Sequence, residues 1–161
     1  MGCMLMKQKK VWITCGIPGS GKSTWVQQQL AINGGTWCSR DKIRFSLLKD
    51  EDEYFSKEDL VFSTWINEIQ AALNDNNIEN VYIDATHLNK KSREKVLNKL
   101  NLMYANLIAV NFLIPIETCI ERNNKRTGRA LVPKDVIESM YKSFQPAVAA
   151  EGYLTIINIT E

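Results

Sequence analysis

Apolar runs and helix-like runs alternate along the chain. Short apolar runs, typical of buried strands, occupy residues 11–16, 36–39, 81–86, 107–114 and 153–159. The segments between them place apolar residues three to four positions apart, which predicts helices over 21–33, 40–49, 56–75, 89–101, 116–126 and 133–144. Strands that alternate with helices predict an α/β fold: a parallel sheet of four to five strands flanked by helices.

The segment 56–75 shows the helical pattern most clearly. Ser56 with Asp59 matches a capping box, so we expect the helix to begin there. Gly34 and Gly35 are good helix-ending residues and should end the first helix. Four apolar side chains of 56–75 are expected to face the core: Phe62, Trp65, Ile69 and Leu73.

Length and composition indicate one globular domain over residues 1–161. Apolar residues make up 45% of the chain and charged residues 24%. The net charge of +2 gives no global basic field for nucleic acid, although a local basic patch is possible. No apolar run approaches the roughly 18 residues of a membrane span, so we expect no membrane partner.

The four cysteines, Cys3, Cys15, Cys38 and Cys119, are far apart and form no C-x-x-C pair. This spacing predicts neither a zinc site nor a disulfide framework, and favours reduced thiols in a cytoplasmic protein. The opening decapeptide lacks the apolar region and cleavage site of a signal peptide. Met6 stands where N-myristoylation requires Ser or Thr, so that modification is not expected.

A glycine-rich loop separates the first strand from the first helix. Residues 16–23 read GIPGSGKS, which matches the Walker A or P-loop pattern G-x-x-x-x-G-K-[ST] in its strand–loop–helix context. Such a loop curls backbone N–H groups around phosphates, and the helix N-terminus adds partial positive charge. The full motif disfavours a turn without a ligand. We expect ATP to contact Gly16, Pro18, Gly19, Ser20, Gly21, Lys22, Ser23 and Thr24.

Within this loop, Lys22 would reach the β- and γ-phosphates and Ser23 would ligate Mg²⁺. A P-loop indicates which ligand is bound but does not identify the reaction. Molecular motors and switches usually have longer chains or a guanine-reading N-K-x-D loop, and this sequence has no such motif. A small phosphotransferase fits the length better.

Ligands of parallel sheets bind at the carboxyl ends of the strands, so the residues that follow each strand are candidates. Arg40, Asp41 and Arg44 follow the second predicted strand. Asp84 and Asn89 follow the core of the third. A carboxylate beside arginines, with a second carboxylate nearby, can supply the proton acceptor and metal support that phosphoryl transfer needs.

Each of these residues also has a structural interpretation. Asp41 could be a helix N-cap, which we disfavour because two arginines flank it. Arg44 could form a surface ion pair or hold an acceptor phosphate. Asp84 could lie near Mg²⁺, as a Walker B carboxylate does, or could bind Ser23 or Thr24.

A basic stretch follows the fourth strand: Arg122, Lys125, Arg126 and Arg129. It could be an exposed helix end, but its continuation into Gly128 and Pro133 favours a small mobile lid. His87, the single histidine, is interpreted as a loop or capping residue and not a catalytic base. The acidic run 50–54 is expected to be solvated, and the four tryptophans are expected in the core.

Four blocks resemble one family in order and spacing: GIPGSGKSTW, SRDKIR, IDATHLN and RNNKRTGRALVPKDVIESMYKS. Together they resemble the kinase domain of the phage-type 5′-polynucleotide kinases, almost from end to end. The first block is generic, whereas the second and fourth are much more specific. The resemblance implies an adenylate-kinase-like P-loop fold and transfer of the ATP γ-phosphate to the 5′-hydroxyl of DNA or RNA.

The resemblance also implies roles for individual residues. On the donor side, Lys22 and Ser23 match phosphate and metal ligands, and Arg122 and Arg126 match lid arginines that contact the nucleotide. Arg126 would share with Lys22 the neutralisation of the developing charge.

On the acceptor side, Asp41 matches the general base and Arg44 the arginine that binds the acceptor's phosphate. Asp84 matches an essential acidic residue, expected near both substrate and metal. The 5′ end of the acceptor nucleic acid should enter between residues 40–44 and the segment near Asn89.

The sequence departs from the family in one respect. Many members continue into a phosphatase domain with a D-x-D-G-T motif, and this sequence contains no such motif. A 3′-phosphatase activity is therefore not predicted. The first hypothesis is an ATP- and Mg²⁺-dependent polynucleotide 5′-hydroxyl kinase acting in nucleic acid repair. The alternatives are a small-molecule or tRNA-linked kinase of the same fold and, less favoured, a non-enzymatic ATP-binding module. The preferred nucleic acid and the oligomeric state stay open.

Overall fold

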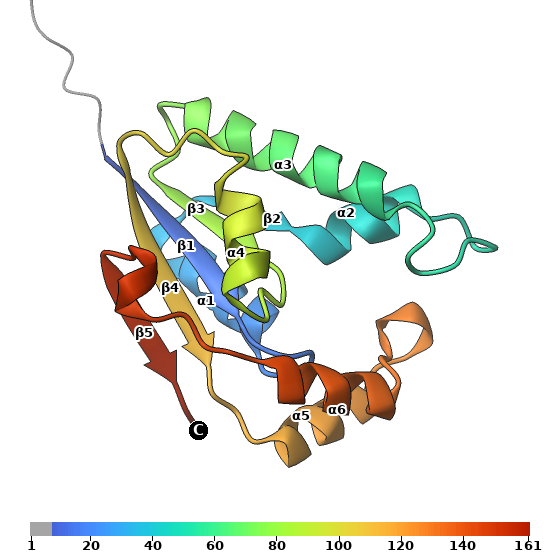
Figure 1. Ribbon diagram of the computed structural model, residues 1–161. Helices are drawn as coiled ribbons and strands as arrows, with labels where there is room; N and C mark the ends of the chain where they lie inside the picture. Colours follow the sequence, from blue (N-terminus) through green and yellow to red (C-terminus); the bar gives the residue numbers. More distant parts are fainter. Residues whose placement is uncertain (1–7) are drawn as a thin grey trace, which may run out of the picture.

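The computed structural model describes residues 8–161, which form one parallel five-stranded sheet with helices around it (Figure 1). The strand order is β2-β3-β1-β4-β5. The expected α/β fold is confirmed. The sequence interpretations that concern Cys3 and Met6 lie outside the described residues. The strands are β1 (Lys9–Cys15), β2 (Thr36–Ser39), β3 (Asn80–Asp84), β4 (Ala105–Phe112) and β5 (Thr155–Ile159).

Six α-helices connect or flank the strands of the described chain. Figure 1 shows α4 in front of the sheet and α1 behind it. None of the described helices has the length and apolar character that crossing a membrane requires. The helices are α1 (Lys22–Asn33), α2 (Arg40–Leu47), α3 (Glu58–Asn74), α4 (Lys90–Leu97), α5 (Ile116–Asn124) and α6 (Lys134–Ser143), with short 3₁₀ turns at Gly128–Ala130 and Ala149–Glu151.

The two faces of the sheet are covered by different helices. On one face, Trp65 and Ile69 of α3 and Val96 of α4 pack against the buried strand residues Val11 and Val81. The other face carries α1, and the segment that contains α5 and α6 packs around buried residues near the carboxyl end of β4. Strand β1 pairs with both β3 and β4, so it is central. A sheet covered on both faces explains why its strands are almost continuously apolar.

The ends of α1 and α3 test the expected helix signals. Helix α1 ends at Asn33, and Gly34 follows with a φ of 67°, as the sequence predicted. The expected capping box of α3 is wrong. The helix begins at Glu58 after Lys57, without a side-chain cap, because the Ser56 hydroxyl instead donates to the Glu53 carbonyl at 2.7 Å and closes a preceding turn.

The apolar positions predicted for α3 are confirmed. Trp65 and Ile69 are fully buried, while Phe62 and Leu73 are partly buried against the same cluster. The other tryptophans are only partly buried. Trp12 and Trp25 belong to an aromatic cluster on the α1 face, with ring centroids 5.9 Å apart.

Candidate active site

The P-loop leaves β1 and turns directly into the N-terminus of α1. Gly19 and Gly21 have φ angles of 82° and 93°, which only glycine adopts readily. A Cβ on Gly19 would also lie 2.3 Å from the Cys119 carbonyl oxygen of α5. Glycine at position 19 therefore lets the loop turn and lets α5 approach it closely.

Lys22 folds back over this loop. Its amino group donates to the Ile17 carbonyl at 2.8 Å and lies 3.5 Å from the Ser20 hydroxyl. Burial lowers the pKa of Lys22, and the charges of Asp84 and Asp41 oppose that shift. Within the described chain the amino group makes no ion pair. The positively charged amino group therefore lies above the loop, where it can pair with a phosphate.

Asp84 ends β3 and receives three hydrogen bonds from three different elements. The donors are Ser23 Oγ of α1 at 3.1 Å, Thr14 Oγ1 of β1 at 2.9 Å and Trp37 Nε1 of β2 at 2.9 Å. The residue is 4% exposed, so its carboxylate is held in one orientation. Of the two interpretations of Asp84, the structure shows the one in which its carboxylate binds Ser23.

Thr14 and Trp37 were missed by the sequence analysis. In the register of the sheet, Ile13 pairs with Ile83 and Trp37 pairs with Tyr82. Thr14 and Trp37 therefore lie on the same face of the sheet as Asp84, the face that α1 covers. Strand alternation could have placed them there, but only with the strand order known.

Ser23 and Asp84 offer two oxygen ligands side by side at the end of the P-loop. No group of three or more His, Cys, Asp or Glu residues that could hold a metal ion occurs in the described chain. Mg²⁺ in phosphoryl-transfer sites usually takes one or two protein ligands and completes its shell with phosphate oxygens and water. These two residues therefore fit a Mg²⁺ ion that arrives with a nucleotide.

Asp41 and Arg44 lie on the first two turns of α2. The N-cap of this helix is Ser39, whose hydroxyl accepts from the Lys42 N–H at 3.3 Å, so an N-cap role for Asp41 is excluded. Arg44 donates to Asp41 Oδ1, and Tyr54 donates to the same oxygen at 3.1 Å. No hydrogen bond from a described residue reaches Asp41 Oδ2. One carboxylate oxygen is thus free to accept a proton.

Arg44 is buried, with 5% exposure, and its main partner is Glu58 at the start of α3. Arg44 Nε donates to Glu58 Oε1 at 2.8 Å, and Arg40 donates to Glu58 Oε2 at 2.9 Å. Burial raises the pKa of Glu58, but its hydrogen bonds and the charges of the two arginines outweigh burial and keep that pKa below its usual value. Glu58 therefore holds both arginines beside Asp41. No sequence pattern distinguishes Glu58 from the other acidic residues of the chain.

The basic stretch that begins in the last turn of α5 contacts two parts of the site. Arg122 donates to the Gly19 carbonyl at 3.4 Å and pairs with Glu161 at 2.6 Å. Arg129 donates to the Asp50 and Asp52 carbonyls at 2.6 and 2.9 Å, in the loop between α2 and α3. The stretch therefore contacts the P-loop at one end and the α2–α3 loop at the other.

Arg126 is exposed, and its guanidinium bonds no described residue. Its charge nevertheless acts on Lys22, in the direction that lowers the lysine's pKa. Asn123, a residue that the sequence analysis missed, fixes the base of the stretch. Its side chain donates to the Val132 carbonyl at 2.7 Å and accepts from the Val132 N–H at 3.0 Å. These two hydrogen bonds join the start of the basic stretch to Val132, three residues past its end.

Asn89 and His87 follow β3 and have structural partners. The Asn89 side chain accepts from the Ser92 N–H at 2.9 Å and caps α4. His87 is buried and donates from Nδ1 to the Thr14 carbonyl at 2.6 Å. Burial lowers the pKa of His87 to about 3, so it stays neutral at physiological pH. This agrees with its interpretation as a loop residue.

The family model described as an AAA domain matches residues 11–147. A curated relative named "Putative bifunctional polynucleotide kinase/RNA ligase", from Autographa californica nuclear polyhedrosis virus, is 24% identical over 165 residues. The match covers 94% of this chain and 23% of the relative. The chain thus spans about a quarter of the length of this relative.

Solved structures with the same fold include a protein of the Pnkp1/Rnl/Hen1 RNA repair complex. Its TM-score is 0.73 with 27% identity, over 88% of this chain and 45% of that one. A fungal RNA kinase gives a TM-score of 0.66 with 14% identity, over 95% and 75% of the two chains. A gluconokinase from Sinorhizobium meliloti 1021 gives 0.60 with 16% identity, over 96% and 83%. The last two likenesses show the fold alone.

Proposed function

This chain belongs to the AAA domain family, and from that membership we propose that it is an ATP-dependent polynucleotide 5′-hydroxyl kinase. It would transfer the γ-phosphate of ATP to the 5′-hydroxyl of DNA or RNA, in nucleic acid repair in the cytoplasm, and residues 1–161 would form its kinase domain. The resemblance to the phage-type polynucleotide kinases and the similarity to a polynucleotide kinase/RNA ligase support this choice of acceptor.

One observation carries the proposal. Lys22 follows β1 and Asp41 follows β2, and both strands end at the same edge of this parallel sheet. Asp84 ends β3 between them and accepts a hydrogen bond from Ser23, the residue after Lys22. The group expected to bind the donor's phosphates and the group expected to take the acceptor's proton therefore lie at one edge of the sheet, and the charge of Asp41 opposes the lowering of the Lys22 pKa by burial. Phosphoryl transfer requires this arrangement, because catalysis depends on positioning the two substrates and on charge stabilisation.

The donor would lie in the P-loop. The backbone N–H groups of Gly19 and Gly21 would bind its phosphates, and Lys22 would reach the β- and γ-phosphates. Arg122 and Arg126 would approach from the basic stretch and offset charge on the transferring group. Bound Mg²⁺, held through Ser23 and Asp84, would supply further neutralisation of phosphate charge.

The acceptor would approach from α2. The 5′-oxygen would attack the γ-phosphorus in line, forming a new P–O bond while the bond to the β–γ bridging oxygen breaks and ADP leaves. The proton of the 5′-hydroxyl would pass to Asp41 Oδ2, the oxygen without a partner in the described chain. Arg40, Arg44 and Asn89 would lie along the acceptor's path, with Arg44 binding its phosphate.

A small-molecule kinase of the same fold is the second candidate. The observation that favours it is the state of Arg44, whose guanidinium already bonds Glu58, Asp41 and Tyr54. An uncharged acceptor would not require Arg44 to change partners. A non-enzymatic ATP-binding module fits less well, since a pure binder needs no carboxylate that faces the P-loop lysine.

Transfer of labelled γ-phosphate to a panel of hydroxyl acceptors tests the proposal. The panel contains single-stranded DNA and RNA with 5′-hydroxyl ends, 3′-mononucleotides, nucleosides, gluconate and an aminoglycoside. The proposal expects label on the 5′-position of the oligonucleotides, lost in the Asp41→Asn variant although that variant still binds ATP in calorimetry. Label on the sugar acceptors alone would support the second candidate and contradict the first.

A further inference from the structure

Three aromatic side chains gather at the corner between α2 and α3. Phe45 lies near the end of α2, while Tyr54 and Phe55 lie in the loop that follows. The rings meet edge to face: the centroids of Phe45 and Tyr54 are 6.2 Å apart at 70°, and those of Tyr54 and Phe55 are 4.6 Å apart at 81°. Phe45 and Phe55 nevertheless remain 40% and 64% exposed.

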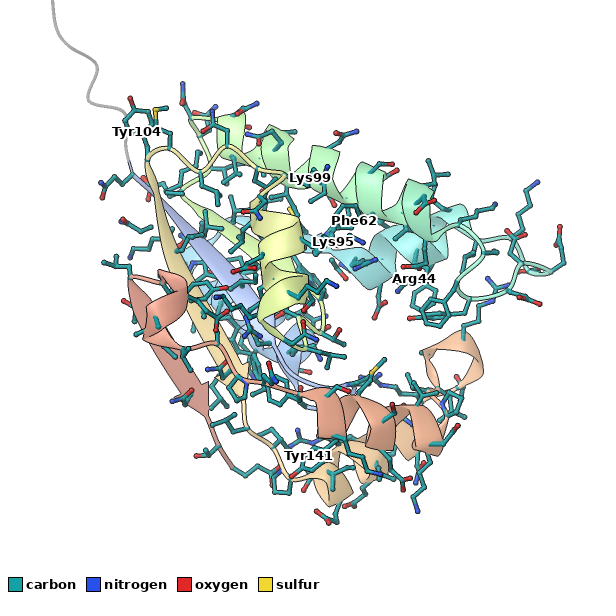
Figure 2. The ribbon with its side chains drawn as sticks, in the orientation of Figure 1. Arg44, Phe62, Lys95, Lys99, Tyr104 and Tyr141 are labelled. Atoms are coloured by element: carbon teal, nitrogen blue, oxygen red, sulfur yellow. The ribbon has the colours of Figure 1, made fainter. Side chains whose placement is uncertain are left out.

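This cluster is joined directly to the candidate active site. The Tyr54 hydroxyl donates to Asp41 Oδ1 at 3.1 Å. The guanidinium carbon of Arg44, labelled in Figure 2, lies 4.5 Å from the centre of the Tyr54 ring and 5.8 Å from that of Phe55. The exposed rings are therefore one side chain away from both groups that the proposed reaction uses on its acceptor side.

The loop that carries the rings is held in place by contacts around it. Lys57 donates to the Leu47 carbonyl at 2.9 Å and pairs with Asp52 at 2.9 Å. Arg129 of the basic stretch donates to carbonyls of the same loop. A large aromatic ring loses favourable burial when it is left in water. A ring that is fixed in position and still uncovered is suited to bind a flat partner.

Of the three rings, Phe55 has the face most available to such a partner. One face of Tyr54 is occupied by the Arg44 guanidinium. Burial raises the pKa of Tyr54 to about 12, so its hydroxyl stays neutral and can donate to Asp41. Tyr54 thus links the cluster to Asp41, and Phe55 presents its ring outward.

We propose that Phe55, supported by Phe45 and Tyr54, is a stacking platform for the terminal nucleobase of the acceptor strand. The inference rests on the proposed function and makes it more specific. A single sugar joins the terminal base to the 5′-oxygen, so an acceptor with its hydroxyl at Asp41 carries its base towards the rings beside Tyr54. Unpaired bases stack on aromatic side chains with little dependence on sequence. The platform therefore favours acceptors with an unpaired 5′-terminal base.

The test compares two acceptors and two substitutions. The acceptors are a 5′-hydroxyl trinucleotide and the same molecule with an abasic first residue. Phe55→Leu keeps an apolar side chain but removes the aromatic face, and Phe55→Trp restores one. Tyr141→Leu is the matched control, because Tyr141 is 46% exposed and lies on α6, away from the α2–α3 loop that carries Phe55 (Figure 2). Thermal melting confirms that each variant is folded.

We expect Phe55→Leu to lower kcat/KM for the intact acceptor about 5- to 150-fold, the range of one base–aromatic contact. Phe55→Leu should leave kcat/KM for the abasic acceptor and the KM for ATP near the parent's values. Phe55→Trp should give values near the parent's on both acceptors. Equal losses on both acceptors, or no loss on either, would contradict the stacking role of Phe55. Activity of the parent on these acceptors would still support the proposed kinase function. A parent that phosphorylates neither acceptor overturns the proposed function and this inference together.

Discussion

Arg44 on α2 and Glu58 on α3 are joined by a hydrogen bond of 2.8 Å from Arg44 Nε to Glu58 Oε1. Glu58 also pairs with Arg40, so one carboxylate of α3 holds the two arginines that surround Asp41. The acceptor side of the site is therefore not formed by α2 alone. It depends on how α3 packs against α2.

Replacing Glu58 with Gln should destabilise the fold, because it leaves the buried Arg44 without its main charged partner. We expect the free energy of unfolding to fall by about 1.5–3 kcal/mol, the usual cost of losing a hydrogen bond to a charged group. Urea denaturation measures it. The control is Glu94→Gln in the exposed Lys90–Glu94 pair, which should change stability by at most about 0.5 kcal/mol. Equal effects of the two substitutions would contradict the role of Glu58.

The effect of Glu58 should depend on pH. Its pKa in the folded protein lies below the ordinary value of 4.5, so its contribution to stability is present above that value and is lost as the pH falls through the folded pKa. The difference in unfolding free energy between the parent and Glu58→Gln should therefore be constant near neutral pH and shrink in acid. Denaturation curves collected from about pH 7 to about pH 3 measure this. A difference that grows with acidity would show the wrong sign.

Trp37→Phe should weaken the support of Asp84. The substitution keeps an aromatic ring but removes the Nε1–H that donates to the Asp84 carboxylate. Trp12→Phe is a matched control, since its indole donates at 3.1 Å to the neutral Asn80 side chain. Loss of a bond to a charged group should cost about 1.5–3 kcal/mol of unfolding free energy, against about 0.5–1.5 kcal/mol for the control. Trp37→Phe should also raise the Mg²⁺ concentration for half-maximal activity, and an unchanged requirement would separate Trp37 from the metal site.

Lys22→Ala should remove nearly all transfer and leave the protein folded. Its amino group bonds loop atoms and makes no ion pair within the described chain, so its charge is not needed by the core. A contact that stabilises transition-state charge should be worth at least about tenfold in kcat. Lys134→Ala, on the exposed surface of α6, is the control. A folded Lys22→Ala protein that keeps more than about a tenth of kcat would contradict the role.

The sequence predicted those parts of the site that depend on local motifs and strand ends. The P-loop is contiguous in the sequence. Asp84 ends one strand and Asp41 follows another, so the parallel sheet alone places both residues at the same edge of the sheet. Their roles in catalysis stay predictions. The parallel fold itself could be predicted from the sequence because β1 and β4 are apolar on both faces.

Residues missed by the sequence analysis depend on contacts between distant segments. Thr14 and Trp37 reach Asp84 only because β1 and β2 lie on either side of β3, an order that apolar patterning does not specify. Glu58 depends on the packing of α3 on α2. The capping box at Ser56 failed for a related reason: two alternatives were open to its hydroxyl, and the turn with Glu53 was formed.

The most direct test of the central claim compares a 3′-nucleotide with the matching nucleoside as acceptors. If Arg44 binds an acceptor phosphate, the parent should prefer the nucleotide, and Arg44→Ala should lower kcat/KM for it by roughly 10- to 150-fold, as expected for about 1.5–3 kcal/mol. The nucleoside should lose little, and ATP affinity should stay near that of the parent. Equal losses on both acceptors would make Arg44 structural. A parent enzyme that shows no preference for the phosphorylated acceptor would contradict the polynucleotide kinase assignment itself.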